Sequence, residues 1–295
     1  MNQSIPFELC KNILWSLLLG VIFASCKKDH RLTLGSKADQ LLKEVSEQLI
    51  WDATVRPHLV GFWKFDGSPS DASGKGNHGE LKQGHPHWGA GIPILTYDRF
   101  GRANKCYHFD NGGNIEVPYT KDLNPKQMTI SLWSKKQLLN RILNPDDYYL
   151  VALNRWNGYK LNYQGQNKIF YTVRWVTPTS SGYYDRDNQT VILDNDVWYH
   201  VAVTFKPGEM DFYINGELAK SWTDTPEPAF TLTSPVNFVI GQDLPTSKYS
   251  LDVNDPDHYV KYGGFFTGDI DDVMFFNAAL TPQQVKSIYI RQSTL

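Results

Sequence analysis

Acidic side chains gather in two stretches of the sequence where they could bind a small ligand. Asp66 and Asp71 lie beside or within a loop of small and polar residues at 67–79, and three further aspartates lie between 269 and 272. The glycines leave the loop backbone free to take irregular conformations, so its carbonyl and carboxylate oxygens can converge on one ligand. In the alternative interpretation, Asp71 accepts hydrogen bonds from its own loop and Asp271 caps a neighbouring loop.

Aromatic residues beside charges point to a second chemistry, the recognition of sugars, which uses ring faces together with planar polar groups. Segments 136–147, 176–190 and 242–264 are expected to be long loops or excursions, and loops of this length in a compact domain are usually functional or disordered. The alternative is that the rings pack in the core, because aromatic residues make up 14% of the chain. The candidate ligand-binding residues are Tyr183, Tyr184, Asp185, Tyr259 and Trp156.

The first residues of the chain have the features of an export signal. A lysine precedes an apolar run at 13–23, which is too short to span a bilayer and has the length of a signal-peptide core. Small residues then precede Cys26, an order that resembles the lipobox of bacterial lipoproteins. We therefore expect a signal peptide at 1–25 and a lipid on Cys26, with a plain secretory signal cut near Ala24 as the alternative. Cys106 would be the only free thiol of the mature chain, so no disulfide is available.

The segment 198–222 is the element around which the rest of the chain is arranged. Alternate residues from Tyr199 to Phe205 are apolar, which indicates a strand with one buried face. A second alternating run follows and ends on Asn215-Gly216, the strongest short hairpin signal because both residues tolerate positive φ. Three antiparallel strands leave an apolar face open and two edges unpaired, so more strands must lie before and after them.

Two helices are expected outside the strands. Residues 36–51 carry apolar side chains at helical spacing, and a strut packed on the β domain is favoured over a spacer or a partner-binding element. Near the C-terminus, Thr281 is the expected N-cap, with Pro282 at the first helical position and Gln284 completing a capping box.

Several motifs resemble, in the same order, those of laminin-G-like domains of the concanavalin A-like superfamily. They are FWKFDG at 62–67, DASGKGNHG at 71–79, HFDNGGNIEVP at 108–118, MTISLWSK at 128–135, WYHVAVTF at 198–205, FYINGEL at 212–218 and GDIDDVMFFNAAL at 268–280. The similarity runs from about residue 59 to residue 291. It implies an all-β fold in which two antiparallel sheets of a jelly roll pack face to face as a sandwich.

The resemblance also implies a metal site. In the family, the acidic loop and the first acid of the IDD segment often share a Ca²⁺ ion, and Asp71, Asn77 and Asp271 occupy the matching positions. Asp66 is a further candidate ligand. Ca²⁺ takes about six to eight oxygen ligands, which a glycine-rich loop facing a strand carboxylate can supply.

A catalytic role is disfavoured by the acids of the late strand. Jelly-roll glucanases of the laminarinase kind need two glutamates roughly 5 Å apart, placed two residues either side of an aspartate. The nearest match begins with Asp269, whose side chain is too short, and has Val273 where the second glutamate is expected. Neither a Ser/His/Asp order, a zinc-binding spacing nor a phosphate-binding loop stands out. We therefore expect no catalytic residues.

The sequence as a whole predicts an exported, lipid-anchored carbohydrate-binding protein of the cell envelope, with its anchor in the outer membrane. A formal charge of −2, without a long basic run after residue 28, argues against nucleic acid as a partner. We expect a signal peptide at 1–25, a tether and helix at 26–58, and the jelly roll at 59–295. The expected partner is an oligo- or polysaccharide, and outer-membrane proteins are further candidates. A protein–protein adhesion module is the competing class, and a glycoside hydrolase is the third.

Overall fold

The computed structural model describes residues 51–138, 148–225 and 236–294, together with part of 38–49. The expected signal peptide and Cys26 lie outside these residues. Within the described part of the chain, no helix has the length and apolar character needed to cross a membrane. The described residues between 38 and 49 are helical, as expected, and Leu42, Val45 and Leu49 are exposed.

The compact unit that contains the β-strands begins at Ile50, before the expected boundary at residue 59. Two short helical turns, η1 (Trp51–Val55) and η2 (Arg56–His58), lead into the first strand. Trp51 and Val55 are buried in a cluster with Leu280 and Val285, so this lead-in segment packs as part of the β unit.

In the described residues, fifteen strands form two antiparallel sheets, which confirms the expected sandwich. Sheet A has the order β13-β12-β11-β6-β15-β4-β3, and β1 also pairs with β15. Its strands are β1 (Leu59–Trp63), β3 (Ile94–Thr96), β4 (Cys106–Phe109), β6 (Met128–Lys136), β11 (Trp198–Lys206), β12 (Glu209–Ile214), β13 (Glu217–Trp222) and β15 (Gly268–Phe276). Sheet B has the order β10-β9-β8-β7-β14-β5-β2. Its strands are β2 (Glu80–Lys82), β5 (Asn114–Val117), β7 (Tyr148–Leu153), β8 (Tyr159–Gln164), β9 (Lys168–Val176), β10 (Ser181–Asp187) and β14 (Phe238–Ile240).

The main core lies between the two sheets and is rich in aromatic rings. Trp63 of β1 stacks on Phe238 of β14 with 5.6 Å between ring centroids, and both rings are fully buried. Tyr159 of β8 stacks on Phe275 of β15 at 5.9 Å. Burying each large apolar side chain stabilises the fold by about 1.5–3 kcal/mol, so these contacts between the sheets are a large part of what holds the sandwich closed.

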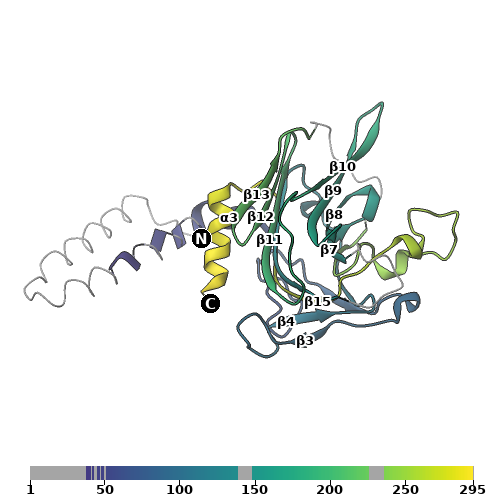
Figure 1. The fold of residues 1–295 in the computed structure, drawn as a ribbon, viewed down its shortest axis with the longest axis horizontal. Coiled ribbons are helices and arrows are strands. Elements are labelled where there is room, and N and C mark those ends of the chain that lie inside the picture. Colours follow the sequence, from purple (N-terminus) through teal and green to yellow (C-terminus); the bar gives the residue numbers. More distant parts are fainter. Residues whose placement is uncertain are drawn as a thin grey trace, which may run out of the picture. The chain divides into compact units, whose positions relative to one another are not determined.

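A C-terminal helix, α3 (Pro282–Ser293), adds a third layer against the outer face of sheet A (Figure 1). The expected capping box is confirmed: the Thr281 side chain accepts from the Gln284 backbone, and Gln284 Oε1 accepts from the Thr281 backbone. Val285 and Ile288 of α3 pack against Ala202 of β11 and against β12. The expectation that β11 has only one buried face is therefore wrong, because α3 covers the second face.

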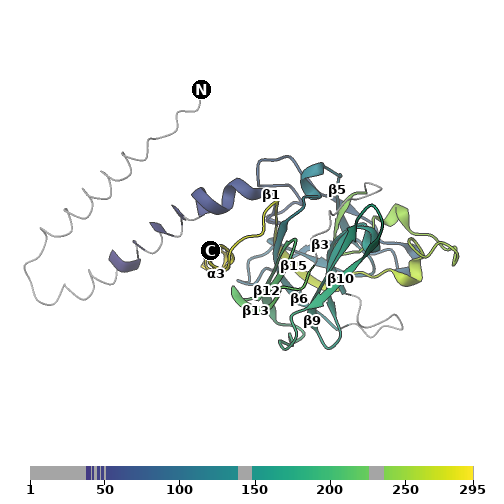
Figure 2. The same ribbon diagram turned by 90° about the horizontal axis from the view of Figure 1, so that it is seen from above.

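The sequence suggested a long loop or excursion at 176–190, but the structure shows that most of this segment is a strand. It contains a tight turn followed by β10, which pairs with β9 from Ser181↔Val176 to Asp187↔Phe170. The segment 242–264 does form an excursion, with two one-turn helices, η6 (Thr246–Lys248) and η7 (Val260–Tyr262). In both ribbon views this excursion lies on the side of the sandwich away from α3 (Figures 1 and 2).

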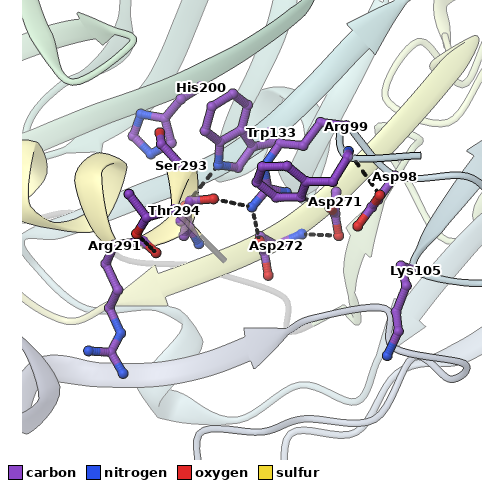
Figure 3. A network of polar contacts seen from close by, with 12 residues as sticks. Asp98, Arg99, Lys105, Trp133, His200, Asp271, Asp272, Arg291, Ser293 and Thr294 are labelled. Carbon is purple, nitrogen blue, oxygen red and sulfur yellow. Dashed lines mark hydrogen bonds and ion pairs between the residues drawn. The ribbon is translucent and has the colours of Figure 1, made fainter. Parts of the chain in front are cut away.

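A buried ionic cluster joins the end of α3 to sheet A (Figure 3). The Arg99 guanidinium donates to Asp271 at 2.6 Å and to Asp272 at 2.8 Å, both on β15. It also donates to the Gln292 carbonyl at 2.7 Å and lies over the Trp133 ring at 4.5 Å. Because Trp133 Nε1 donates to Gln292 Oε1 at 3.0 Å, the last turn of α3 is fixed by both partners.

Two carboxyl groups share a single guanidinium in this cluster, and the pKa values of both are raised. Burial first and the Asp272 charge second raise the pKa of Asp271 to about 9, although Arg99 acts in the opposite direction. Burial also raises the pKa of Asp272. The folded state therefore holds a proton on the pair at neutral pH, which leaves the cluster without net charge.

The raised pKa predicts that the cluster loses stability as pH rises. The unfolded aspartate releases its proton near 3.8, whereas the folded one keeps it to about 9. Between these values the native state binds more protons, so the free energy of unfolding should fall as pH increases. Asp271→Asn carries no charge to bury, so urea unfolding from pH 6 to pH 9 should show a smaller fall for this variant than for the wild type. An equal fall in both proteins would contradict this protonation state.

Arg99→Ala is the complementary test of the same cluster. Removing one partner of a buried ion pair costs about 3–5 kcal/mol, and here it leaves two carboxylates without their cation. The matched control is Arg56→Ala, because Arg56 and its partner Asp52 are both exposed. Such pairs contribute about 0–1 kcal/mol. Equal losses in the two variants would show that Arg99 is not a structural centre.

Candidate functional site

The outer face of sheet B is set by the alternation of β9. Ile169, Tyr171 and Val173 are buried in the core between the sheets. Successive side chains of a strand point to opposite faces, so Phe170, Thr172 and Arg174 lie on the outer face. The sequence pattern predicts the inward set, whereas the outward set mixes apolar Phe170 with polar Thr172 and Arg174 and has no consistent pattern.

Three cross-strand pairs follow one another on this face, and we call them the β9–β10 ladder. They are Asp187↔Phe170, Asp185↔Thr172 and Tyr183↔Arg174. The Thr172 hydroxyl donates to Asp185 Oδ1 at 2.6 Å. At the far end Tyr183 is 46% exposed, and the Arg174 guanidinium carbon lies 6.0 Å from its ring centroid.

A chain of polar contacts connects the ladder to the 242–264 excursion. Arg174 donates to Asn157 Oδ1, and Asn157 Nδ2 donates to Asp257 Oδ2 at 3.2 Å. Asn157 lies in the short turn η5 (Arg155–Asn157) between β7 and β8. Strand β9, through Arg174, therefore meets the η5 turn and the excursion at the Tyr183 end of the ladder.

The excursion is held in place by a buried ion pair. Arg155 Nε donates to Asp243 Oδ2 at 2.6 Å, and both side chains are almost completely buried. Arg155 also donates to the carbonyl oxygens of Asp257 at 3.1 Å and Tyr259 at 3.4 Å. This anchoring fixes the position of Asp257 relative to sheet B, as a preorganised binding surface requires.

The structure brings some of the predicted ligand-binding residues together and separates others. Tyr183 and Asp185 share the outer face. Tyr259 lies in the adjoining excursion, where its carbonyl accepts a hydrogen bond from Arg155 of η5. Tyr184 is on the opposite face, where it packs against the core and lies 6.3 Å from the Trp175 ring. The backbone of Trp156 is in η5, and its side chain lies outside the described residues.

Sequence reasoning missed Phe170, Arg174 and Asn157 as members of this surface. The signal that could have found the first two is the pairing of β9 with the polar run at 181–187, because an outward residue on one strand faces an outward residue on the other. Asn157 has no such signal, since its neighbours come from distant parts of the chain. Together with Tyr183 and Asp257, Arg174 and Asn157 present an exposed ring beside a guanidinium, a carboxylate and an amide. This combination suits a hydroxyl-rich ligand.

The loop at 67–79 uses its central acid to hold itself together. Asp71 accepts from the backbone of Phe62, Ser73 and Asn77 at 2.8–2.9 Å and from the Ser73 hydroxyl at 2.8 Å. Although burial acts to raise it, these four hydrogen bonds hold the pKa of Asp71 below its usual value. Asn77 is also engaged, since its amide donates to the Val60 carbonyl at 2.8 Å.

Three of the four predicted metal ligands have other partners in the structure. Asp71 is occupied by loop donors, Asp271 is paired with Arg99, and Asp66 lies 3.2 Å from Lys105. In the parts of the chain that the structure describes, no group of three or more His, Cys, Asp or Glu side chains is arranged to hold a metal ion. The Asp71 contacts match the alternative role of turn formation, whereas Asp271 pairs with Arg99 rather than capping a loop, and calcium binding stays a prediction of the resemblance.

The hydrogen bonds of the loop predict that Asp71 stabilises the fold whether or not Ca²⁺ is present. Asp71→Ala removes acceptors from backbone donors, so it should destabilise the protein by about 1.5–3 kcal/mol with or without Ca²⁺. Thermal scans of both proteins in Ca²⁺ and in chelator test this. A Ca²⁺-dependent rise in the wild type that Asp71→Ala abolishes would show that the loop and the late strand do bind the ion.

Comparisons with solved structures show the same fold in proteins of low sequence identity. Domain 4 of AbnA, an extracellular arabinanase from Geobacillus stearothermophilus in complex with arabinotriose, has a TM-score of 0.55 and 19% identity, covering 79% of this chain and 98% of that one. The ligand-binding domain of botulinum neurotoxin serotype D in complex with N-acetylneuraminic acid has a TM-score of 0.53 and 18% identity, covering 82% and 53%. The binding domain of Paraclostridial Mosquitocidal Protein 1 has a TM-score of 0.57 and 15% identity, covering 81% and 53%.

At these identities the likeness shows the fold alone, and the chain spans about half the length of the toxin domains. The search of curated proteins finds no match. A family model described as the concanavalin A-like lectin/glucanases superfamily matches residues 109–286, which is more than half of the chain. The chain therefore belongs to the concanavalin A-like lectin/glucanases superfamily.

Proposed function

We propose that the protein binds an extracellular glycan on the outer face of sheet B and serves polysaccharide capture at the cell envelope. The observation that carries the proposal is the exposed Tyr183 ring beside Arg174, at the point where the β9–β10 ladder meets Asn157 and Asp257. A ring face packs against the C–H face of a sugar, while the guanidinium, carboxylate and amide bond its hydroxyl groups.

The structural neighbours support a binding role for this fold. The arabinanase domain is in complex with arabinotriose, and the serotype D toxin domain is in complex with N-acetylneuraminic acid. Those ligands differ in size, ring type and charge, so the fold does not define one sugar. The identity of the glycan depends on side chains such as those of the ladder.

The proposal includes no catalytic step. On β15, Asp269 lies 2.7 Å from His108 and 2.6 Å from Lys135, while Arg99 occupies Asp271 and Asp272. A retaining glycosidase needs two carboxyl groups about 5 Å apart that reach the substrate from one face. The acids of β15 instead have cationic partners, which supports a non-catalytic role.

A protein–protein adhesion module is the second candidate function, and one surface favours it. Ile92, Ile94, Tyr97 and Phe100 are 41–63% exposed around the edge strand β3 of sheet A. Exposed apolar side chains beside an unpaired strand edge are typical of protein contacts. This surface lies on the other sheet from the β9–β10 ladder, so mutations can separate the two functions.

Glycan binding should depend on Tyr183. Loss of one stacked aromatic ring costs about 0.5–1.5 kcal/mol, so Tyr183→Ala should weaken binding up to roughly tenfold. The measurement is an array of linear and sialylated glycans that includes arabinotriose, followed by titration calorimetry on the glycans retained. The control is Tyr97→Ala, because Tyr97 is also exposed but belongs to the sheet A edge.

Three results would contradict the proposal. The first is an array on which no glycan is retained, and the second is equal weakening by Tyr97→Ala and Tyr183→Ala. The third is release of reducing sugar from β-glucan that Asp271→Asn abolishes, because this would indicate a glycoside hydrolase.

Anchoring should depend on Cys26, which we propose carries the lipid. Cys26→Ala removes the acylated side chain, so the variant should move from the membrane fraction to the soluble fraction. Cys10→Ala is the matched control, since Cys10 lies within the expected signal peptide and should leave fractionation unchanged. Retention of Cys26→Ala in the membrane fraction would overturn the lipoprotein assignment.

A further inference from the structure

A depression opens on the outer face of sheet B at the end of the ladder opposite Tyr183. It has a volume of about 470 Å³ and is lined by Gln164, Gly165, Gln166, Lys168, Phe170 and Asp187. The register Gln164↔Lys168 and Phe170↔Asp187 places these side chains on one face, although they come from three strands. The depression is therefore part of the sheet surface that the ladder occupies.

The chemistry of the depression matches a sugar ring. The partly buried Phe170 ring supplies an apolar face, while Lys168 and Asp187, 3.8 Å apart, supply a donor and an acceptor. Lys168 also lies close enough to Asp187 to balance its charge, which suits a neutral ligand. Aromatic rings flanked by a few oriented polar groups are typical of small-ligand sites.

Two buried oxygens beside the depression have no hydrogen-bond donor. Gln164 Oε1 and Asn162 Oδ1 are both buried without a partner among the described residues. They lie two residues apart on the outer face of β8, and Asn162 is directly opposite Phe170. An unpaired buried acceptor is costly, so a ligand rich in hydroxyl donors would relieve a cost that the free protein carries.

We infer that the depression is a second sugar subsite and that the ligand is a linear oligosaccharide whose successive units lie along β9. The inference rests on the proposed glycan binding. Phe170 and Arg174 are four positions apart on β9, about 13 Å at ~3.3 Å per residue, or roughly three sugar units. One sugar ring cannot contact both ends, whereas a short chain crosses the exposed Asp185 on its way from one to the other.

Chain-length dependence tests the inference. The probes are linear arabino-oligosaccharides and the linear series of every other glycan that the array retains, from one to six units. For the wild type, affinity measured by calorimetry should rise through about three units and then level off. Phe170→Ala and Tyr183→Ala should each weaken trisaccharide binding about tenfold and remove the gain from lengthening the chain.

Further variants separate binding from folding. Phe170→Tyr keeps the ring and should retain affinity, while Gln164→Leu removes the acceptor and should weaken the trisaccharide. Leu218→Ala, an exposed apolar position on β13 of sheet A, should leave binding unchanged.

Failure of the inference can be told from failure of the proposed function. If Phe170→Ala binds the trisaccharide like the wild type while Tyr183→Ala does not, the ligand occupies only the Tyr183 end. The subsite is then rejected and glycan binding stands. An affinity that is the same for one and for three units would reject the subsite in the same way. If no glycan binds the wild type, the proposed function fails and the inference fails with it.

Discussion

The register between β9 and β10 decides which side chains reach the outer face of sheet B. A slip of one residue would move Tyr183 and Asp185 to the core side and bring Tyr184 and Arg186 outward. The register is fixed on the core side by the buried side chains of β9 and on the outer side by the Thr172–Asp185 hydrogen bond. At the end of β10, Trp222 Nε1 donates to the Asp187 carbonyl at 2.8 Å and attaches this edge strand to β13 of sheet A. The ligand contacts proposed for Tyr183, Asp185 and Asp187 follow from this register.

The two sheets use their outer faces differently. The outer face of sheet A packs against α3, and the Arg99 cluster ties the last turn of that helix to β15. This sheet is therefore buried on both sides over β11 and β12, as in a three-layer arrangement. The outer face of sheet B instead carries the polar residues of the ladder, next to the excursion that Arg155 and Asp243 hold. The division leaves the β9–β10 edge of sheet B, where Tyr183 and Asp185 are exposed, as the surface on which a ligand can lie.

Much of the fold could be predicted from the sequence, because the signals are local. The Asn215-Gly216 hairpin, the existence of strand β11 and the Thr281 capping box each depend on residues close in the chain, and the structure confirms all three. Strand β10 was missed because its SGYYDRD sequence has a polar outer face and lies at a sheet edge, where the apolar alternation is weak.

The candidate site was only partly predictable, because only some of its signals are local in the sequence. Tyr183 and Asp185 were found because an aromatic residue beside charges is visible in sequence. Tyr184 was chosen with them, but it lies between Tyr183 and Asp185 on β10, so its side chain points to the opposite face. Arg99 pairs with acids 172 and 173 positions away, so the sequence contains no sign that Asp271 already has a cation partner. Contacts between distant segments are the part that required coordinates.

A structure of the full chain in complex with a bound oligosaccharide is the most direct measurement of the central claim. The account predicts continuous sugar density on the outer face of sheet B, with one ring over Phe170, another beside Tyr183, and hydroxyl groups bonded to Gln164, Asp185 or Arg174. Density at the 67–79 loop or along the β3 edge of sheet A, with the β9–β10 ladder left bare, would contradict it.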